Sequence, residues 1–316
     1  MRKIAKISVL VLLMALITGC GRSGGRMLMV QAIYQERTGN GVTLCLMCAD
    51  SEPSANAGEA QVKQLAIPGE GDSLQAAWED AVRSAGQELF LGQCRAWLVG
   101  ENILDTLDGE DAAFWAEQDH GCAGMPMWFV DLTPAEAKAM AEQSELLLSA
   151  LEYLEQSSGL KGMPAYRLDQ TLQMLPYVAV SENGAVQPKE LWLRRDGEVV
   201  LSWQPKQIQL ALWIQGEARR VELETEQGTL TLQWPTAAWG RSGEHLILRL
   251  EGALPDAELT PEEQSALEQH IARSVTELIT QTLSAGADVF GLEHRQALLG
   301  TSGAPAVEVR LTAGEN

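Results

Sequence analysis

The sequence predicts an α+β fold of three small domains, in which mixed, largely antiparallel sheets are flanked by helices. Two features predict it. Alternating apolar and polar runs joined by tight-turn residues mark strands, and capping boxes at Thr133 and Thr260 start amphipathic helices. A hydrophobic content of 46% and a charged content of 21% are those of an ordinary globular protein. The length of 316 residues favours two or three domains over one.

The first twenty residues have the layout of a lipoprotein signal peptide, with a basic start and an apolar run over residues 7–17. That run is shorter than the roughly 20 residues a membrane-spanning helix needs, so residues 1–19 are expected to be cleaved. Ile17-Thr18-Gly19-Cys20 has a branched residue and two small residues before the cysteine, the lipobox of bacterial lipoproteins. Cys20 is therefore the predicted lipid-attachment site, joined to a diacylglyceryl group. An ordinary signal peptide with an incidental cysteine is the weaker alternative.

Residues 20–26 would then form a lipidated tether. Two acyl chains, such as palmitate, make attachment stable, whereas one gives marginal binding. The six residues after Cys20 span at most roughly 20 Å, so the folded body is expected close to the membrane. Arg22 and Arg26 either contact anionic headgroups or are plain linker charges.

The chain is strongly acidic, with a formal net charge of −20. Removal of Arg2, Lys3 and Lys6 with the signal peptide leaves −23. This charge excludes nucleic acid as a partner, because such binding needs a basic patch. It also argues against the body lying flat on an anionic membrane.

The four remaining cysteines do not predict a metal or redox site. Cys45 and Cys48 lie in an apolar run typical of a strand, where residues three apart point to opposite faces. No second CxxC is present, so buried thiols are the favoured interpretation. The sequence does not decide whether Cys94 and Cys122 form a disulfide. No metal and no cofactor are expected.

In the first half, strands are expected over residues 27–35, 42–49 and 61–67, the first two joined by a hairpin turn. Asp72 or Ser73 caps a helix with apolar residues at helical spacing. Short strands and helices follow up to a strand over residues 127–130. The capping box at Thr133, with proline at the first helical position, starts a single helix that ends at residues 157–159.

In the second half, hairpins are expected around the turns at residues 195–197 and 226–228, followed by a strand over residues 245–251. The capping box at Thr260 starts the longest helix, residues 261–285, and residues 306–311 form the last strand. These elements divide the chain into an N-terminal α+β domain (27–159), a small β-rich middle domain (160–212) and a C-terminal α+β domain (213–316).

Three stretches carry a family resemblance. They are Gly71-Asp72-Ser73-Leu74-Gln75-Ala76-Ala77, the run from Leu89 to Glu101, and Asp288-Val289-Phe290-Gly291 after the long helix. In order and spacing behind a lipobox, they resemble the Ger(x)C lipoproteins, the C subunits of spore germinant receptors. Gln75, Gln93 and Glu293 depart from the family pattern, and the stretch after Leu292 is short and lacks tryptophan. The chain therefore looks like a divergent, shortened member.

The resemblance implies three small α/β domains and a role in nutrient-triggered spore germination. It implies assembly with the membrane-embedded A and B subunits of the germinant receptor, and anchoring on the outer face of the spore inner membrane of a spore-forming bacterium. Whether a small-molecule nutrient contacts this subunit is left open. For residues 288–291 the sequence itself predicts a structural role: Gly286 ends the helix, Asp288 hydrogen-bonds local backbone and Phe290 fills the core.

We expect no enzyme activity. The sequence has no nucleophile elbow, no zinc-binding His-Glu-x-x-His and no phosphate-binding glycine loop. Its four histidines are scattered, and Glu262 and Glu263 begin a helix. Five tryptophans between residues 192 and 239 are expected to pack in sheets rather than form a sugar-binding strip.

Two other classes of protein are alternatives. A lipid-anchored solute-binding protein of a transporter would need two similar lobes with parallel sheets, which the hairpin-rich second half disfavours. An envelope hydrolase is disfavoured by the missing nucleophile and base.

Overall fold

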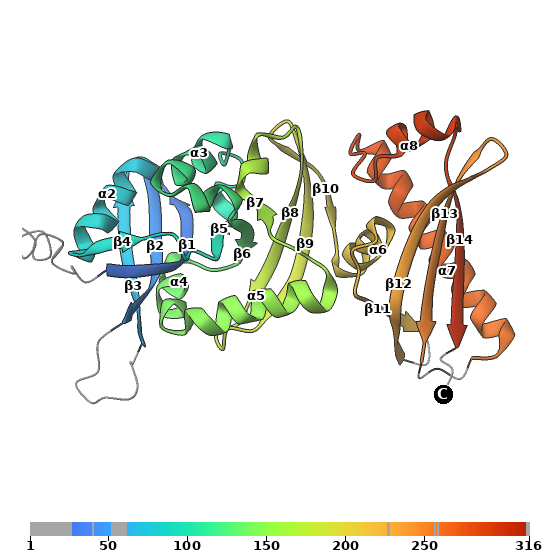
Figure 1. The fold of residues 1–316 in the computed structure, drawn as a ribbon, viewed down its shortest axis with the longest axis horizontal. Coiled ribbons are helices and arrows are strands. Elements are labelled where there is room, and N and C mark those ends of the chain that lie inside the picture. Colours follow the sequence, from blue (N-terminus) through green and yellow to red (C-terminus); the bar gives the residue numbers. More distant parts are fainter. Residues whose placement is uncertain are drawn as a thin grey trace, which may run out of the picture.

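The computed structural model describes residues 27–39, 41–51, 62–225, 228–255, 257 and 259–313. The chain forms two bodies along one long axis, the first built on a large sheet and the second on a four-stranded sheet (Figure 1). Both sheets mix parallel and antiparallel pairings and are flanked by helices, so the predicted α+β class is confirmed. No helix within the described ranges is long and apolar enough to cross a membrane.

The first sheet has the strand order β10-β9-β8-β6-β5-β1-β2-β3, with β4 beside β1 and β7 beside β6. The strands are β1 (Met27–Thr38), β2 (Gly41–Ser51), β3 (Val62–Gly71), β4 (Glu88–Phe90), β5 (Ala96–Gly100), β6 (Pro126–Val130), β7 (Met163–Pro164), β8 (Leu172–Val180), β9 (Val186–Arg195) and β10 (Glu198–Trp203). Strands β1, β5, β6 and β8 run parallel to one another, and antiparallel hairpins extend the sheet on both sides. The predicted hairpin of the first two strands is confirmed.

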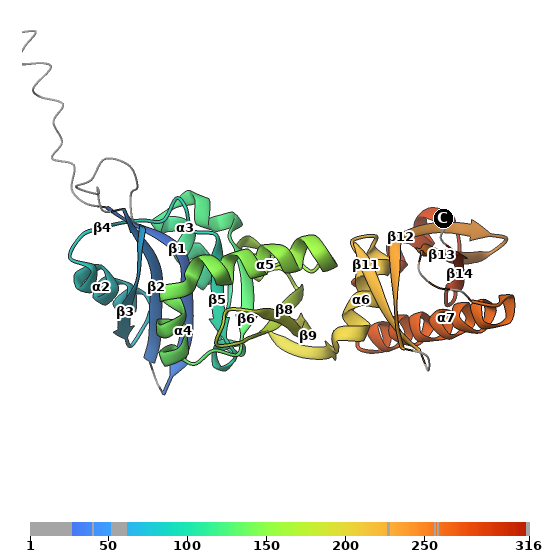
Figure 2. The ribbon, with the colours of Figure 1, turned by 90° about the horizontal axis from the view of Figure 1, so that it is seen from below.

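Helices cover both faces of this sheet. On one face, α2 (Leu74–Ala85) and α3 (Gly109–Gln118) bury Ala77 and Trp115 in one apolar cluster. On the other, α4 (Pro134–Met140) and α5 (Ser144–Ser158) bury Ala137 and Leu147 in a second cluster. Helix α5 lies along the sheet toward the second body (Figure 2).

The prediction of a single helix from Thr133 to residues 157–159 is wrong, because the structure has two helices there. The capping box is present, but a 3-10 turn over Ala141–Gln143 separates α4 from α5. The buried Ser144 begins α5 and its hydroxyl donates to Gln31 Oε1 at 2.9 Å. This contact fixes the start of α5 on β1, so the two helices follow the sheet in separate directions.

The second body consists of β11 (Arg220–Thr225), β12 (Gly228–Ser242), β13 (His245–Leu254) and β14 (Ala306–Ala313) with α6 (Pro205–Gln215), α7 (Pro261–Ser284) and α8 (Leu292–Leu299). Helix α7 begins at the predicted capping box of Thr260. Leu232 and Leu248 of the sheet pack with Ile271 and Val275 of α7 in one cluster. The opposite face of the sheet carries the cross-strand ion pair between Arg249 Nε and Glu308 Oε2 at 3.0 Å.

The middle segment differs from the expectation of a domain over residues 160–212. Its strands continue the first sheet, because β8 pairs in parallel with β6 through Phe129 and Tyr177. The expected boundary between residues 212 and 213 falls inside α6, a helix that the sequence analysis missed. Strands β8, β9 and β10 form an antiparallel meander, which alone would leave the backbone of β8 unpaired on one side. Pairing with β6 satisfies that edge, so the segment joins the first sheet instead of forming its own domain.

The two bodies meet at a joint with continuous apolar packing. Trp203 at the end of β10 stacks on Phe290, with ring centroids 5.8 Å apart and an interplanar angle of 14°. Arg195 Nη1 donates to the carbonyl oxygen of Gly286 at 2.9 Å. The backbones of the two bodies also approach each other closely at Gly159 and Glu217. A Cβ on Gly159 would lie 2.1 Å from the carbonyl oxygen of Glu217.

Candidate functional site

The predicted lipid-attachment residue, Cys20, lies outside the described residues. The first described residue, Met27, begins β1 and pairs with Glu88 of β4. Strands β1 and β4 begin in the part of the first sheet beside α2 and β3, far from the second body (Figure 2). We call this part of the molecule the tether end.

The motif at residues 71–77 packs a helix on a strand. The Ser73 hydroxyl accepts a hydrogen bond from the Ala76 amide at 3.2 Å and caps α2, one of the two caps the sequence offered. A Cβ on Gly69 would lie 2.2 Å from the carbonyl oxygen of Ala77, and one on Gly71 would lie 2.5 Å from the Ala77 nitrogen. The glycines therefore allow α2 to approach β3 closely.

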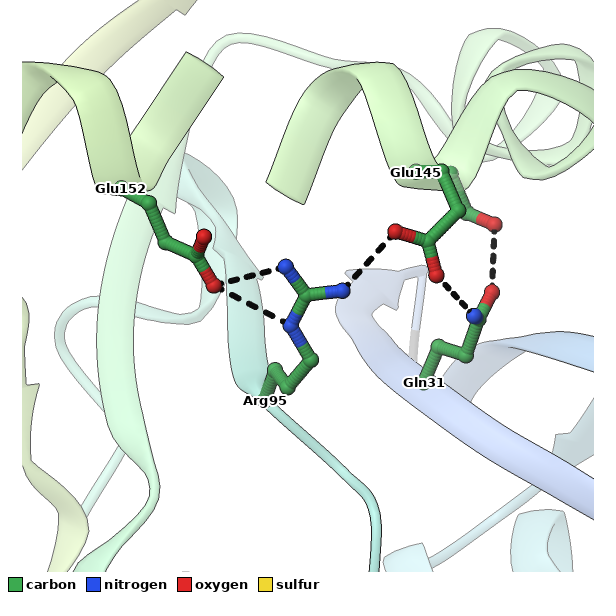
Figure 3. Close-up of polar contacts among 5 residues, drawn as sticks. Gln31, Arg95, Glu145 and Glu152 are labelled. Atoms are coloured by element: carbon green, nitrogen blue, oxygen red, sulfur yellow. Dashed lines mark hydrogen bonds and ion pairs between the residues drawn. The ribbon is translucent and has the colours of Figure 1, made fainter. Parts of the chain in front are cut away.

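The motif at residues 89–101 contains a polar clamp between the sheet and α5. Arg95 donates to Glu145 Oε2 at 2.9 Å and to Glu152 Oε1 at 2.6 Å, and both carboxylates project from α5 (Figure 3). The Arg95 amide donates to the Gln31 carbonyl oxygen at 2.8 Å. Gln31 Nε2 donates to Glu145, which closes the set. We call Gln31, Arg95, Glu145 and Glu152 the α5 clamp.

The end of the same motif makes room for a buried carboxyl group. A Cβ on Gly100 would lie 1.8 Å from Glu36 Oε2, so only glycine fits there. Glu36 accepts hydrogen bonds from Tyr34 Oη and the Arg37 amide, both at 3.1 Å. Burial raises the pKa of Glu36 above its ordinary value, and these hydrogen bonds oppose the shift.

The motif at residues 288–291 has the predicted structural role. Gly286 follows α7 with a positive φ of 69°. Asp288 accepts hydrogen bonds from the amides of Leu292 and Glu293 at 2.7 and 2.9 Å, which caps α8. Phe290 is buried against Trp203 at the joint.

Polar groups also meet where the parallel strands end, as expected for the carboxyl edge of such strands. Tyr177 Oη donates to Glu101 Oε2 at 2.8 Å, and Lys189 Nζ donates to Tyr177 Oη at 2.9 Å. Asp131 accepts from the Val180 amide at 2.9 Å and lies 3.6 Å from Lys189 Nζ. These groups form hydrogen bonds and an ion pair with one another, so we assign them a structural role. The sequence analysis missed the cluster because it did not predict parallel pairing.

Within the part of the chain that the structure describes, the cysteines and histidines do not gather into a metal site. Cys45 and Cys48 belong to apolar clusters on opposite faces of β2, as predicted. The four cysteines of the described ranges are free thiols, including Cys94 and Cys122, and burial raises the pKa of Cys45 and of Cys122 to about 11. The four histidines are exposed on four separate elements. Within the described ranges, no three His, Cys, Asp or Glu side chains are placed to hold a metal ion.

The tryptophans of the middle segment mostly pack in the core. Trp192, Trp203 and Trp213 are buried, and Arg295 lies over the ring of Trp239 at 5.1 Å from its centroid. Trp234 is the exception, since it is 71% exposed at a bulge of β12 with a φ of 49°. The preference for packing over a sugar-binding strip holds for the three buried rings.

A half-open groove of about 510 Å³ lies at the joint. The first body contributes Leu160 and Met174, and the second contributes Leu212, Gln215 and Val289. Lys161 Nζ and Glu217 Oε2, 3.0 Å apart, form an ion pair across the groove. The groove could admit a small molecule, and its geometry does not select one chemical class. Sequence reasoning missed it because it forms only when the two bodies meet.

Comparisons with known proteins give one likeness. No family model and no curated protein matches the chain. Among solved structures, the chain is similar to the crystal structure of the GerBC protein, with 10% sequence identity and a TM-score of 0.41. The likeness covers 88% of this chain and 96% of that one. Because the TM-score is below 0.5, neither the fold assignment above nor the function proposed below rests on this likeness.

Proposed function

We propose that this chain is a non-catalytic lipoprotein subunit of a spore germinant receptor, needed for receptor assembly and for nutrient-triggered germination. The observation that carries the proposal is a lipobox at Cys20 followed, in order, by the three motifs at residues 71–77, 89–101 and 288–291. Its partners would be the membrane-embedded A and B subunits. The diacylglyceryl group on Cys20 would hold it on the outer face of the spore inner membrane.

The positions of the motifs support a scaffold rather than a catalyst. The first motif packs α2 on β3, the second clamps α5 to the sheet, and the third seats Phe290 at the joint. Each motif therefore holds two elements of the fold together, which is a structural role. Two carboxylates of these motifs have structural partners, since Glu101 accepts a hydrogen bond from Tyr177 and Asp288 caps α8.

The second candidate, a solute-binding lipoprotein of a transporter, draws on one observation, the groove at the joint. Solute-binding proteins of that class enclose their ligand between two similar lobes. Here one body has a large sheet with a parallel centre, and the other has a four-stranded sheet. This dissimilarity favours the receptor subunit.

The test is genetic. In the spore-forming host, deletion of the gene is expected to abolish or strongly slow germination in at least one nutrient, followed as loss of optical density. Complementation with wild type and with Ser23→Ala in the tether should restore germination, whereas Cys20→Ala should not. Unchanged germination of the deletion strain in every nutrient tried would contradict the proposal. Capture of an ATP-driven permease, instead of multi-spanning receptor subunits, from detergent extracts would favour the second candidate.

A further inference from the structure

Exposed apolar side chains concentrate at the tether end of the molecule. Of the eleven large apolar residues exposed within the described ranges, four lie there. They are Met27 (41% exposed), Val62 (56%), Val82 (42%) and Phe90 (38%). The other seven are spread over six helices, turns and strands of both bodies. We call these four residues the apolar tip.

Strand pairing places three of the four on one face of the sheet. Phe90, Met29, Ala49 and Gln64 form one row across β4, β1, β2 and β3. Met27 and Val62 each lie two residues before this row, and side chains two residues apart share a face. Neighbouring strands are roughly 5 Å apart, so Met27 and Val62 are about 10 Å apart at the same level. Val82 belongs to the last turns of α2, which leads directly into β4.

The α5 clamp marks where helical cover of this face stops. Gln31 lies two residues beyond the shared row on β1, and it bonds to Ser144 and Glu145 at the start of α5. Arg95 joins the same helix from the segment after β4 (Figure 3). From Gln31 toward Met27 the sheet therefore extends past α5, and Met27, Val62 and Phe90 remain exposed.

Basic side chains lie beside the apolar tip although the chain as a whole is acidic. The chain has 23 basic and 43 acidic residues, yet Lys63 follows Val62 and Arg83 follows Val82. Acidic groups lie there too: Asp50 is the cross-strand partner of Lys63, Glu88 pairs with Met27 of β1, and Asp80 is paired with Arg83 at 3.3 Å. In the sequence, Arg26 immediately precedes Met27, and Arg22 lies five residues before it.

We propose that the apolar tip contacts the lipid bilayer, with Met27, Val62 and Phe90 at the boundary between headgroups and acyl chains. This inference rests on the proposed function, because it takes the bilayer from the lipid on Cys20. Six residues separate Cys20 from Met27 and span at most roughly 20 Å, so no other surface of the body is held as near to the anchor. Apolar residues beside Lys and Arg are the composition of surfaces that lie in a membrane interface. A protein partner on the same tip is the alternative that the experiment separates.

The contact is end-on. The second body lies at the opposite end of the long axis, and the joint lies between the two bodies (Figure 2). An end-on body keeps most of the acidic surface more than a Debye length of roughly 8 Å from anionic headgroups. The groove at the joint would then face the aqueous space, away from the bilayer.

The experiment uses the lipidated protein, purified from membranes and reconstituted in vesicles of phosphatidylcholine and phosphatidylglycerol. Nitroxide labels are attached at Ser84→Cys, on the last turn of α2, and at the matched exposed site Ser302→Cys in the second body. The native thiols of the described ranges are buried or half-buried, with pKa values raised by burial, so labelling at the introduced cysteine is favoured. Relaxation by oxygen, which partitions into lipid, is compared with relaxation by a water-soluble nickel complex.

We expect the ratio of oxygen to nickel relaxation to be several-fold higher at position 84 than at position 302. The triple variant Met27→Gln, Val62→Gln, Phe90→Gln should remove most of this difference while the protein stays on the vesicles. Equal, water-like ratios at both positions in vesicle-bound protein would overturn the inference and leave the proposed function intact. Lipid-like ratios only after the A and B subunits are added would assign the tip to a protein partner and overturn it too. Protein that carries no lipid and does not bind vesicles would contradict the proposed function itself.

Discussion

The two ends of the first sheet differ in whether their large apolar residues are buried or exposed. At the joint, Trp203 and Phe290 are buried because the second body covers the sheet end. At the tether end, Met27 and Phe90 remain exposed because α5 stops at its clamp. At the joint, the second body therefore buries the apolar residues at the end of the first sheet. The exposed residues Met27 and Phe90 lie near the predicted lipid anchor. Under the proposal above, the bilayer would cover them as the second body covers Trp203.

The largest effect is expected from Phe290→Ala at the joint. Loss of a fully buried phenyl ring costs about 3–5 kcal/mol of unfolding free energy. Here it also removes the stacking partner of Trp203. Urea unfolding followed by circular dichroism measures the change. Trp234→Ala, at an exposed ring, is the matched aromatic control and should change stability by less than about 0.5 kcal/mol. Equal losses in the two variants would contradict the account of the joint.

A smaller loss is expected from Gly69→Ala, under the helix that flanks the apolar tip. The new Cβ would lie 2.2 Å from the Ala77 carbonyl oxygen, so α2 must move away from β3. Overpacking of this kind costs about 1–3 kcal/mol. The control is Gly124→Ala, where a Cβ meets no atom within 4 Å. A thermal unfolding midpoint that is the same in both variants would show that the strand and the helix do not need this close approach.

The buried carboxyl group of Glu36 should give stability a pH dependence of definite sign. Burial raises its pKa, so the folded state binds the proton more tightly than the unfolded state. Its contribution is fully present below the unfolded pKa of about 4.3 and is lost as pH rises through the higher folded pKa. Glu36→Gln should therefore stabilise the protein relative to wild type more at neutral pH than at pH 4.

Glu136→Gln is the matched control for this pH dependence. Hydrogen bonds from the Thr133 amide and hydroxyl lower the pKa of Glu136, so its contribution is lost as pH falls instead. Asp111 has a pKa raised by burial and leaves a residual slope of the Glu36 sign in the variant. Urea midpoints between pH 4 and pH 8 measure both variants. An unchanged slope in Glu36→Gln would show that Glu36 is not the source.

The smallest stability effect is expected at the apolar tip. Each of Met27→Gln, Val62→Gln and Phe90→Gln replaces an exposed side chain and should change the unfolding free energy by less than about 0.5 kcal/mol. Denaturant unfolding of the triple variant tests this. A loss comparable to that of Phe290→Ala would mean that these residues belong to the core, and the contrast between the two ends would fail.

The sequence predicted local structure better than architecture. Capping boxes at Thr133 and Thr260 and the glycine-containing turns are local signals, and the helices and hairpins they mark are present. Helix α6 was missed although Gln204 and Gln207 form a capping box around Pro205, because the signal used glutamine instead of serine or threonine at the cap. The pairing of β8 with β6 joins residues about 50 positions apart and has no local signal.

The candidate sites show the same limit. The structural role of Asp288 and Phe290 could be predicted, because helix ends and apolar anchors follow from neighbouring residues. The α5 clamp joins Arg95 to residues 50 and 57 positions away, so no spacing rule announces it. The apolar tip depends on where helical cover stops, which only the packed structure defines.

The account depends most on the lipid at Cys20, and mass spectrometry of the mature N-terminus tests it directly. Protein purified from membranes and digested after Arg22 should yield the peptide of residues 20–22 with a diacylglyceryl group on the cysteine sulfur. An unmodified Cys20, or mature protein recovered from the medium, would contradict the anchor and with it the membrane-facing orientation.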